Sequence, residues 1–161
     1  MSFLSNVDVR KASTMRTGPG PKLKSWQNIE GTKAHSRMKQ ALLLDDNIAQ
    51  LTVRELVLRK AEIESHVATR GQSALALLRS DAGRAKIGVV ITDHLMPDMD
   101  GVEFVRQLRT FNQEVPVIVI SGLPDADIEY AGLNVIFRVK PCDPEDLIAL
   151  VKSSLNLRAS A

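Results

Sequence analysis

Five polar side chains directly follow short apolar runs, and their types are those that phosphoryl transfer requires. They are, in chain order, Asp45, Asp46, Asp93, Ser121 and Lys140. Carboxylates packed within a few ångströms repel one another unless a cation or a proton intervenes, and hard oxygen ligands suit Mg²⁺ or Mn²⁺. The set therefore predicts a Mg²⁺ (or Mn²⁺) site with a carboxylate nucleophile, in which Lys140 and Ser121 contact the phosphoryl oxygens.

The elements that would position these side chains begin at residue 40, where short apolar runs alternate with amphipathic stretches. This is the pattern of βαβ units around a parallel sheet. Five runs are expected to be strands: 41–44, 63–68, 89–92, 115–120 and 135–139. Their continuous apolar character predicts strands covered by helices on both faces. Ligands of an open parallel sheet bind beyond the carboxyl ends of its strands, so topology alone should gather the five side chains at one edge.

Helical periodicity fills most of the connections between these runs. Apolar residues recur at helical spacing within 51–58, 74–78 and 102–108. The connection at 125–131 is short and is cut off by Gly132, so we expect a single turn or an irregular loop there. A last helix is predicted after Pro144, because a proline and the two acids that follow it suit a helix amino end.

The stretch 40–157 resembles the receiver domain of response regulators. The resemblance rests on the acidic pair at 45–46, the run 93–101, the Ser-Gly pair at 121–122 and the Lys-Pro pair at 140–141, which fall in family order with family-like spacing. It implies a flavodoxin-like (βα)5 doubly wound parallel sheet, an α/β fold with strand order 2-1-3-4-5.

The resemblance also implies a role for each matching residue. Asp93 would be the phosphoacceptor, Asp46 would bind the metal directly, and Asp45 would bind it through water. The backbone carbonyl of Leu95 would supply a further ligand. Turn formation by Asp45 and helix capping by Asp46 are the alternatives for the acidic pair.

Three further residues take family roles in the same way. Ser121 and Phe137 resemble the switch pair, in which the hydroxyl moves toward the phosphoryl group and the aromatic ring rotates inward. Lys140 resembles the family's lysine, and its bond to Pro141 is expected to be cis. Phe137 has a plain core role as its alternative. His94 is expected to face away from the pocket or to rim it.

As a function, the resemblance implies a phosphoacceptor signalling domain rather than an enzyme with a separate substrate. A histidine kinase or histidine phosphotransfer protein would donate the phosphoryl group, autodephosphorylation would remove it, and a downstream effector protein would read the switch. The alternatives are a receiver fragment of a hybrid histidine kinase in a phosphorelay and a phosphorylation-independent interaction module. An aspartate-dependent phosphohydrolase would want an acid two residues after its nucleophile, where Leu95 stands.

Length and charge set the domain organisation that we expect. The 161 residues suit one domain plus an appendage. Residues 1–39 carry eight basic and two acidic side chains, a net charge of +6, whereas the remainder carries −4. We therefore predict a flexible basic extension or leader at 1–38 and a receiver domain at 39–158. The extension could bind nucleic acid or an acidic partner, but charge alone is weak support for either.

Composition bounds the setting in which the protein would act. No apolar run approaches the ~20 residues of a transmembrane helix, and Cys142 is the only cysteine, which favours a reducing, cytoplasmic location. Cys142 is expected to be a half-buried spectator near the site. Neither a DNA-binding output domain nor a membrane segment is expected. A homodimer is possible. The short connection at 125–131 nevertheless argues against an ordinary dimer through the surface that this connection forms.

Overall fold

The computed structural model describes residues 38–156, which contain a five-stranded parallel sheet. Its strands are β1 Gln40–Leu44, β2 Ser65–Ala68, β3 Ile87–Asp93, β4 Val117–Ser121 and β5 Ile136–Val139. They lie in the order β2-β1-β3-β4-β5, and every neighbouring pair is parallel. This confirms the predicted α/β fold with strand order 2-1-3-4-5. The predicted extension, apart from its last residue, and the predicted domain end at 158 lie outside the described residues and stay predictions.

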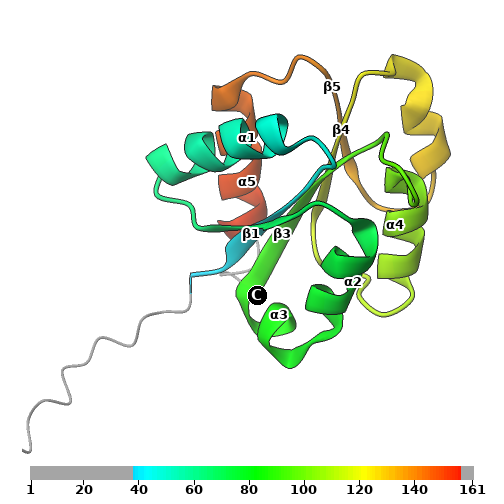
Figure 1. Cartoon of the computed structure of the whole chain (residues 1–161), viewed down its shortest axis with the longest axis horizontal. Helices are drawn as coiled ribbons and strands as arrows, with labels where there is room; N and C mark the ends of the chain where they lie inside the picture. Colours follow the sequence, from blue (N-terminus) through cyan, green and yellow to red (C-terminus); the bar gives the residue numbers. More distant parts are fainter. Residues whose placement is uncertain (1–37, 157–161) are drawn as a thin grey trace, which may run out of the picture. The chain divides into compact units, whose positions relative to one another are not determined.

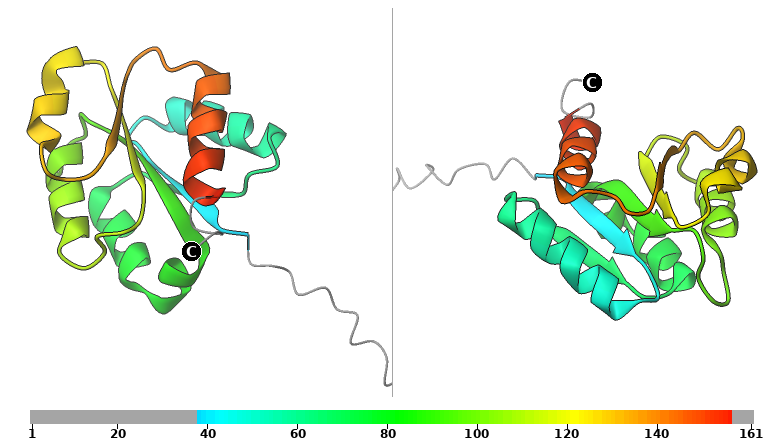
Figure 2. Two further views of the ribbon diagram at one scale, coloured as in Figure 1. Left: turned by 180° about the vertical axis from the view of Figure 1, so that it is seen from behind. Right: turned by 90° about the horizontal axis from the view of Figure 1, so that it is seen from above.

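Helices cover both faces of the sheet. They are α1 Ile48–Lys60, α2 Gly71–Arg79, α3 Asp81–Lys86, α4 Gly101–Arg109, α5 Pro144–Asn156 and the 3₁₀ helix η1 Pro124–Tyr130. Helices α1 and α5 lie side by side on one face, and α2 and α4 lie on the other (Figure 1, with further views in Figure 2). No helix between residues 38 and 156 is long and apolar enough to cross a bilayer.

The core consists of two apolar layers, one on each side of the sheet, because successive strand residues point to opposite faces. On β1, Leu42 and Leu44 join one layer with α2 and α4, whereas Ala41 and Leu43 join the other with α1 and α5. All seven residues of β3 are buried. A central strand that is buried on both faces explains why the apolar runs in the sequence are continuous rather than alternating.

Two strands begin two residues later than the sequence predicts, and local hydrogen bonds explain both differences. The predicted strand at 63–68 begins at Ser65, since the Ile63 amide donates to the carbonyl of Leu58 and so closes the turn after α1. The predicted strand at 115–120 begins at Val117, since the Val115 amide donates to Oδ1 of Asn112. Both residues are buried but belong to the turns that lead into the strands.

Side-chain caps fix where the helices begin beside the site. Oδ1 of Asn47 accepts from the Gln50 amide at the start of α1, and Oδ1 of Asp100 accepts from the Glu103 amide at the start of α4. Such caps satisfy amides that have no partner within the helix. The alternative that Asp46 caps the first helix is wrong, because Asn47 is the cap. The single turn or irregular loop expected at 125–131 is instead the seven-residue 3₁₀ helix η1, which at about three residues per turn is longer than expected.

Candidate functional site

The carboxyl ends of β1, β3, β4 and β5 form one edge of the sheet, which we call the carboxyl edge. Strand register aligns them: Leu44 pairs with Thr92, Asp93 with Ile120, and Ser121 with Val139. Asp93 and Ser121 are the last residues of their strands, whereas Asp45 and Lys140 follow theirs. The topology therefore brings the predicted side chains to a common edge.

Asp93, the last residue of β3, is buried, with only 6% of its surface exposed. Its Oδ2 accepts a hydrogen bond from the Leu95 amide at 3.2 Å. Its Oδ1 is buried without a well-directed hydrogen bond, yet the ammonium Nζ of Lys140 lies 2.5 Å away. A buried carboxylate is costly unless a charge compensates it, and the ammonium of Lys140 supplies that compensating charge.

Lys140 is placed by backbone contacts that tie β5 to β4. Its amide donates to the carbonyl of Ser121 at 2.7 Å, and its bond to Pro141 is cis, as expected. The side chain is 29% exposed, so the ammonium bridges buried Asp93 and solvent. A cation in that position can contact both the Asp93 carboxylate and an incoming anionic group.

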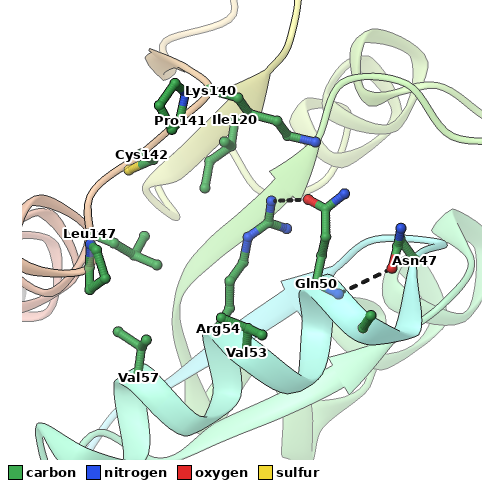
Figure 3. Close-up of a pocket in the computed structure, with 12 residues that line it drawn as sticks. Asn47, Gln50, Val53, Arg54, Val57, Ile120, Lys140, Pro141, Cys142 and Leu147 are labelled. Carbon is green, nitrogen blue, oxygen red and sulfur yellow. Dashed lines mark hydrogen bonds between the residues drawn. The ribbon is translucent and has the colours of Figure 1, made fainter.

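Asp45 has a partner that the sequence did not indicate. Its Oδ2 accepts from Nη1 of Arg54 at 2.6 Å, and its Oδ1 accepts from the Asn47 amide at 2.8 Å. Asp45 is 1% exposed and Arg54 11% exposed, so the pair is buried. Nη2 of Arg54 also donates to Oε1 of Gln50 at 2.9 Å (Figure 3). Asp46, by contrast, is exposed to solvent.

The carboxyl edge offers donors that fit a hard cation, although they are not gathered into a cage. Within residues 38–156 no three His, Cys, Asp or Glu side chains are grouped so that they could hold a metal ion. The available donors are nevertheless all oxygens, namely the carboxylates of Asp46 and Asp93 and backbone carbonyls. Oδ1 of Asp93 also has no well-directed hydrogen bond. This chemistry suits Mg²⁺, which keeps several waters and takes few protein ligands.

The predicted switch residues have local partners. Oγ of Ser121 accepts from the Leu123 amide at 2.9 Å and lies 3.1 Å from the carbonyl of Leu123, so a tight turn holds the hydroxyl. Phe137 is half-buried and packs against the layer of α2 and α4, with its ring centroid 5.8 Å from that of Tyr130. These contacts fit a switch pair and also a plain core role for Phe137, so the switch stays a prediction.

His94 is buried and joins η1 rather than the carboxyl edge. Its Nδ1 lies 2.9 Å from the hydroxyl oxygen of Tyr130, and its Nε2 lies 3.7 Å from Oε1 of Glu129. Burial raises the pKa of the Tyr130 phenol, and the charges of nearby carboxylates, Asp100 first, raise it further. The phenol therefore keeps its proton at neutral pH. Sequence reasoning missed Tyr130, which links the residue after Asp93 to η1.

Replacement of Gly101 by alanine is expected to destabilise the fold by about 1–3 kcal/mol through overpacking. A Cβ there would lie 2.5 Å from the Tyr130 hydroxyl and 2.6 Å from the backbone oxygen of Asp93. Urea unfolding measures the loss. Gly122→Ala is the matched control, because a Cβ at Gly122 meets no atom within 4 Å. Equal midpoints for the two variants would contradict the predicted crowding behind Asp93.

A pocket of about 720 Å³ opens between α1 and the segment that joins β5 to α5 (Figure 3). Its walls include Gln50, Val53, Arg54, Lys140 and Leu147. Cys142 also lines it and is half-buried; burial, followed by the charge of Asp146, raises the pKa of its thiol. A thiol with a raised pKa is a poor nucleophile, which agrees with the spectator role expected for it.

Comparison with known proteins shows which family this chain resembles. The family model for the response regulator receiver domain matches residues 41–152. The cyclic di-GMP phosphodiesterase response regulator RpfG of Xanthomonas campestris pv. campestris is 33% identical over 122 residues, which are 73% of this chain and 32% of that protein. The transcriptional regulatory protein PrrA of Mycobacterium tuberculosis is 33% identical over 124 residues, 75% of this chain and 52% of that protein. The chain thus spans about half or less of these relatives.

Solved structures agree on the fold. A response regulator receiver domain protein from Clostridium thermocellum superposes with a TM-score of 0.69 at 23% identity, covering 75% of this chain and 97% of the other. At that identity the likeness concerns the fold alone. It matches the order of strands and the two helical layers described above.

Proposed function

The chain belongs to the response regulator receiver domain family, and from this premise we propose that it accepts a phosphoryl group on Asp93 and signals by a change of conformation. The observation that carries the proposal is the ion pair at the carboxyl edge between buried Asp93 and partly exposed Lys140, whose charged atoms lie 2.5 Å apart. It combines a nucleophile with a cation that can neutralise charge on phosphoryl oxygens.

In the proposed reaction, a carboxylate oxygen of Asp93 attacks the phosphorus of a phosphohistidine. The new bond is O–P, the bond that breaks is P–N, and its electron pair leaves with the imidazole. Lys140 would contact the oxygens of the transferred group, and the Ser121 hydroxyl would turn from Leu123 toward that group. In-line positioning and charge stabilisation supply most of the acceleration in such transfers. Water attacking phosphorus would later return Asp93 to its free form.

The proposed reaction depends on a divalent cation, Mg²⁺ or Mn²⁺. Asp46, Asp93 and the backbone carbonyl of Leu95 would hold it directly, and Asp45 would do so through water. When bound, the cation neutralises charge on the transferred group. Asp46 is exposed and free to approach a cation, which supports its direct role.

The proposed donor is a histidine kinase or a histidine phosphotransfer protein, and the proposed reader is an effector protein. A cytoplasmic location suits both. A receiver fragment of a hybrid histidine kinase remains an alternative, because the chain covers only part of its relatives. A homodimer is a further alternative, although the short connection at η1 argues against an ordinary dimer through that surface.

Incubation with acetyl phosphate tests this proposal without a cognate kinase. With Mg²⁺ present, the intact mass should rise by one phosphoryl group, and EDTA should prevent the gain. Neutral hydroxylamine should remove the group, because an acyl phosphate is labile to that nucleophile whereas a phosphoserine is not. A gain that ignores EDTA or survives hydroxylamine would count against a phosphoaspartate.

One observation favours a second candidate, a receiver-like interaction module that is never phosphorylated. Arg54 already neutralises Asp45, one of the carboxylates that would otherwise call for a cation. The same mass measurement separates the two candidates. Absence of any phosphoryl gain at high acetyl phosphate and high Mg²⁺ would favour the interaction module.

A further inference from the structure

The pair of Arg54 and Asp45 places a built-in positive charge where the sequence predicts only carboxylates and one lysine. Both oxygens of Asp45 are engaged, one by the Arg54 guanidinium at 2.6 Å and the other by the Asn47 amide at 2.8 Å. Gln50 accepts from the second nitrogen of Arg54 and so holds the guanidinium in place. Figure 3 shows the Arg54 and Lys140 side chains reaching the same end of the pocket from opposite walls.

The net charge of the side chains at the carboxyl edge determines how strongly this edge attracts a divalent cation. Three carboxylates and Lys140 alone would leave two uncompensated negative charges, whereas Arg54 reduces this to one. A cation-bound water that contacts Asp45 must also share an oxygen with the guanidinium or displace it, and the like charges of cation and guanidinium repel most strongly in a poorly solvated site. Arg54 therefore opposes cation binding both by repulsion and by occupying an acceptor.

The location of Arg54 follows from the helix on which it lies. Asn47, Gln50 and Arg54 are spaced i, i+3 and i+7, which puts them on one face of α1. Asp45 lies three residues before this helix begins, and its ion pair with Arg54 shows that this face is turned toward the carboxyl edge. A guanidinium with two planar donors can then bind Asp45 and Gln50 at once, a geometry that a lysine could not reproduce.

We propose that the Arg54 guanidinium competes with the divalent cation for Asp45 and thereby sets the cation affinity of the site. The inference rests on the proposed metal-dependent function and deepens it. In the cation-free protein Arg54 compensates Asp45, and binding of Mg²⁺ weakens that pair. The consequence is a site that fills only at a higher Mg²⁺ concentration than its carboxylates would otherwise require.

Binding of Mn²⁺ to the full chain, followed by electron paramagnetic resonance of the free ion, tests the competition directly. Arg54→Gln should bind Mn²⁺ at least about tenfold more tightly than the unaltered protein, because it removes a unit charge next to the site. Arg59→Gln is the matched control. It removes the same charge from an exposed position on the same helix and should leave the affinity unchanged.

Thermal unfolding gives a second readout that needs no phosphorylation. Loss of Arg54 leaves a buried carboxylate without its ion pair, so Arg54→Gln should unfold at a lower temperature in EDTA. Mg²⁺ should then raise its melting temperature more than that of the unaltered protein, because a ligand that binds more tightly stabilises the folded state more at the same concentration. A Mg²⁺ effect of equal size in both proteins would overturn the inference.

Two variants at the acidic pair keep the test decisive if Arg54→Gln does not fold. Asp45→Asn should leave Mn²⁺ affinity almost unchanged, because Arg54 already cancels the charge of Asp45, whereas Asp46→Asn should lower it by removing a direct ligand. A larger loss of Mn²⁺ affinity in Asp45→Asn than in Asp46→Asn would contradict the proposed competition. Equal Mn²⁺ affinities of Arg54→Gln and the unaltered protein would contradict it as well. Neither result would bear on whether Asp93 is phosphorylated, because the acetyl phosphate measurement tests that separately. Absence of Mn²⁺ binding in every protein would overturn both the inference and the proposed metal dependence.

Discussion

Replacement of Asp93 by asparagine is expected to abolish phosphoryl transfer to the protein. The asparagine amide has nearly the same shape as the carboxylate, but its neutral oxygen is a far weaker nucleophile. It also removes the charge that pairs with Lys140 at 2.5 Å. Intact mass after incubation with acetyl phosphate and Mg²⁺ should show no gain, whereas the unaltered protein should gain one phosphoryl group.

Asp98→Asn is the control for this experiment. Asp98 lies on the loop that follows β3 and has a φ of 67°, a conformation that asparagine tolerates about as well as aspartate. The control changes the same charge in the same loop, and it should gain the phosphoryl group at the normal rate. A gain that persists in Asp93→Asn would place the acceptor on another residue, and a loss in Asp98→Asn would point to loop geometry instead.

The sheet could be predicted from the sequence because its central strands, β1, β3 and β4, lie in an apolar environment. Strand β3 is buried along its whole length, so its sequence is a continuous apolar run that no other element explains as well. The position of each strand determines where the residue at its carboxyl end lies. Asp93, Ser121 and Lys140 were therefore expected at a common edge. Strand starts were less predictable, because buried turn residues such as Ile63 look the same as strand residues.

Helix α3 was not predicted, because almost nothing in its sequence signals a helix. The segment Asp81–Lys86 has no apolar stripe, and Gly83 lies in its middle. Local contacts hold it instead: Oγ of Ser80 accepts from the Gly83 amide at 3.0 Å, and Arg84 pairs with Asp81 at 2.6 Å. The close approach of Gly83 to the carbonyl of Leu77 leaves no room for a Cβ.

Partners of the site were less predictable than the site itself, because they depend on tertiary contacts. An arginine on a helix is normally solvated, and only the spacing of Asn47, Gln50 and Arg54 hinted that this one faces the carboxyl edge. The pairing of His94 with Tyr130 joins residues 36 apart in the chain. No local pattern reports such a contact, since it arises only when η1 packs beside β3 and α4.

Removal of the Lys140 ammonium is expected to slow phosphorylation of Asp93 by about 10²–10³-fold. That is the usual cost of losing one charge-stabilising donor from a site of this kind. Lys140→Met keeps the length and much of the apolar stem but has no charge. The rate at which the mass increases with acetyl phosphate and Mg²⁺ measures the effect. Lys140→Arg, which keeps a positive charge, should lose less than Lys140→Met.

Lys140→Met should also show how much Lys140 contributes to the stability of the unphosphorylated protein. Without the ammonium, Asp93 is a buried carboxylate with no ion pair, so Lys140→Met should lower the free energy of unfolding by about 1–3 kcal/mol. Asp93→Asn in the same chain removes the uncompensated charge and should recover most of that loss. A double variant that is no more stable than Lys140→Met would show that the lysine stabilises the fold by packing, and that its proximity to Asp93 matters only in the transfer reaction.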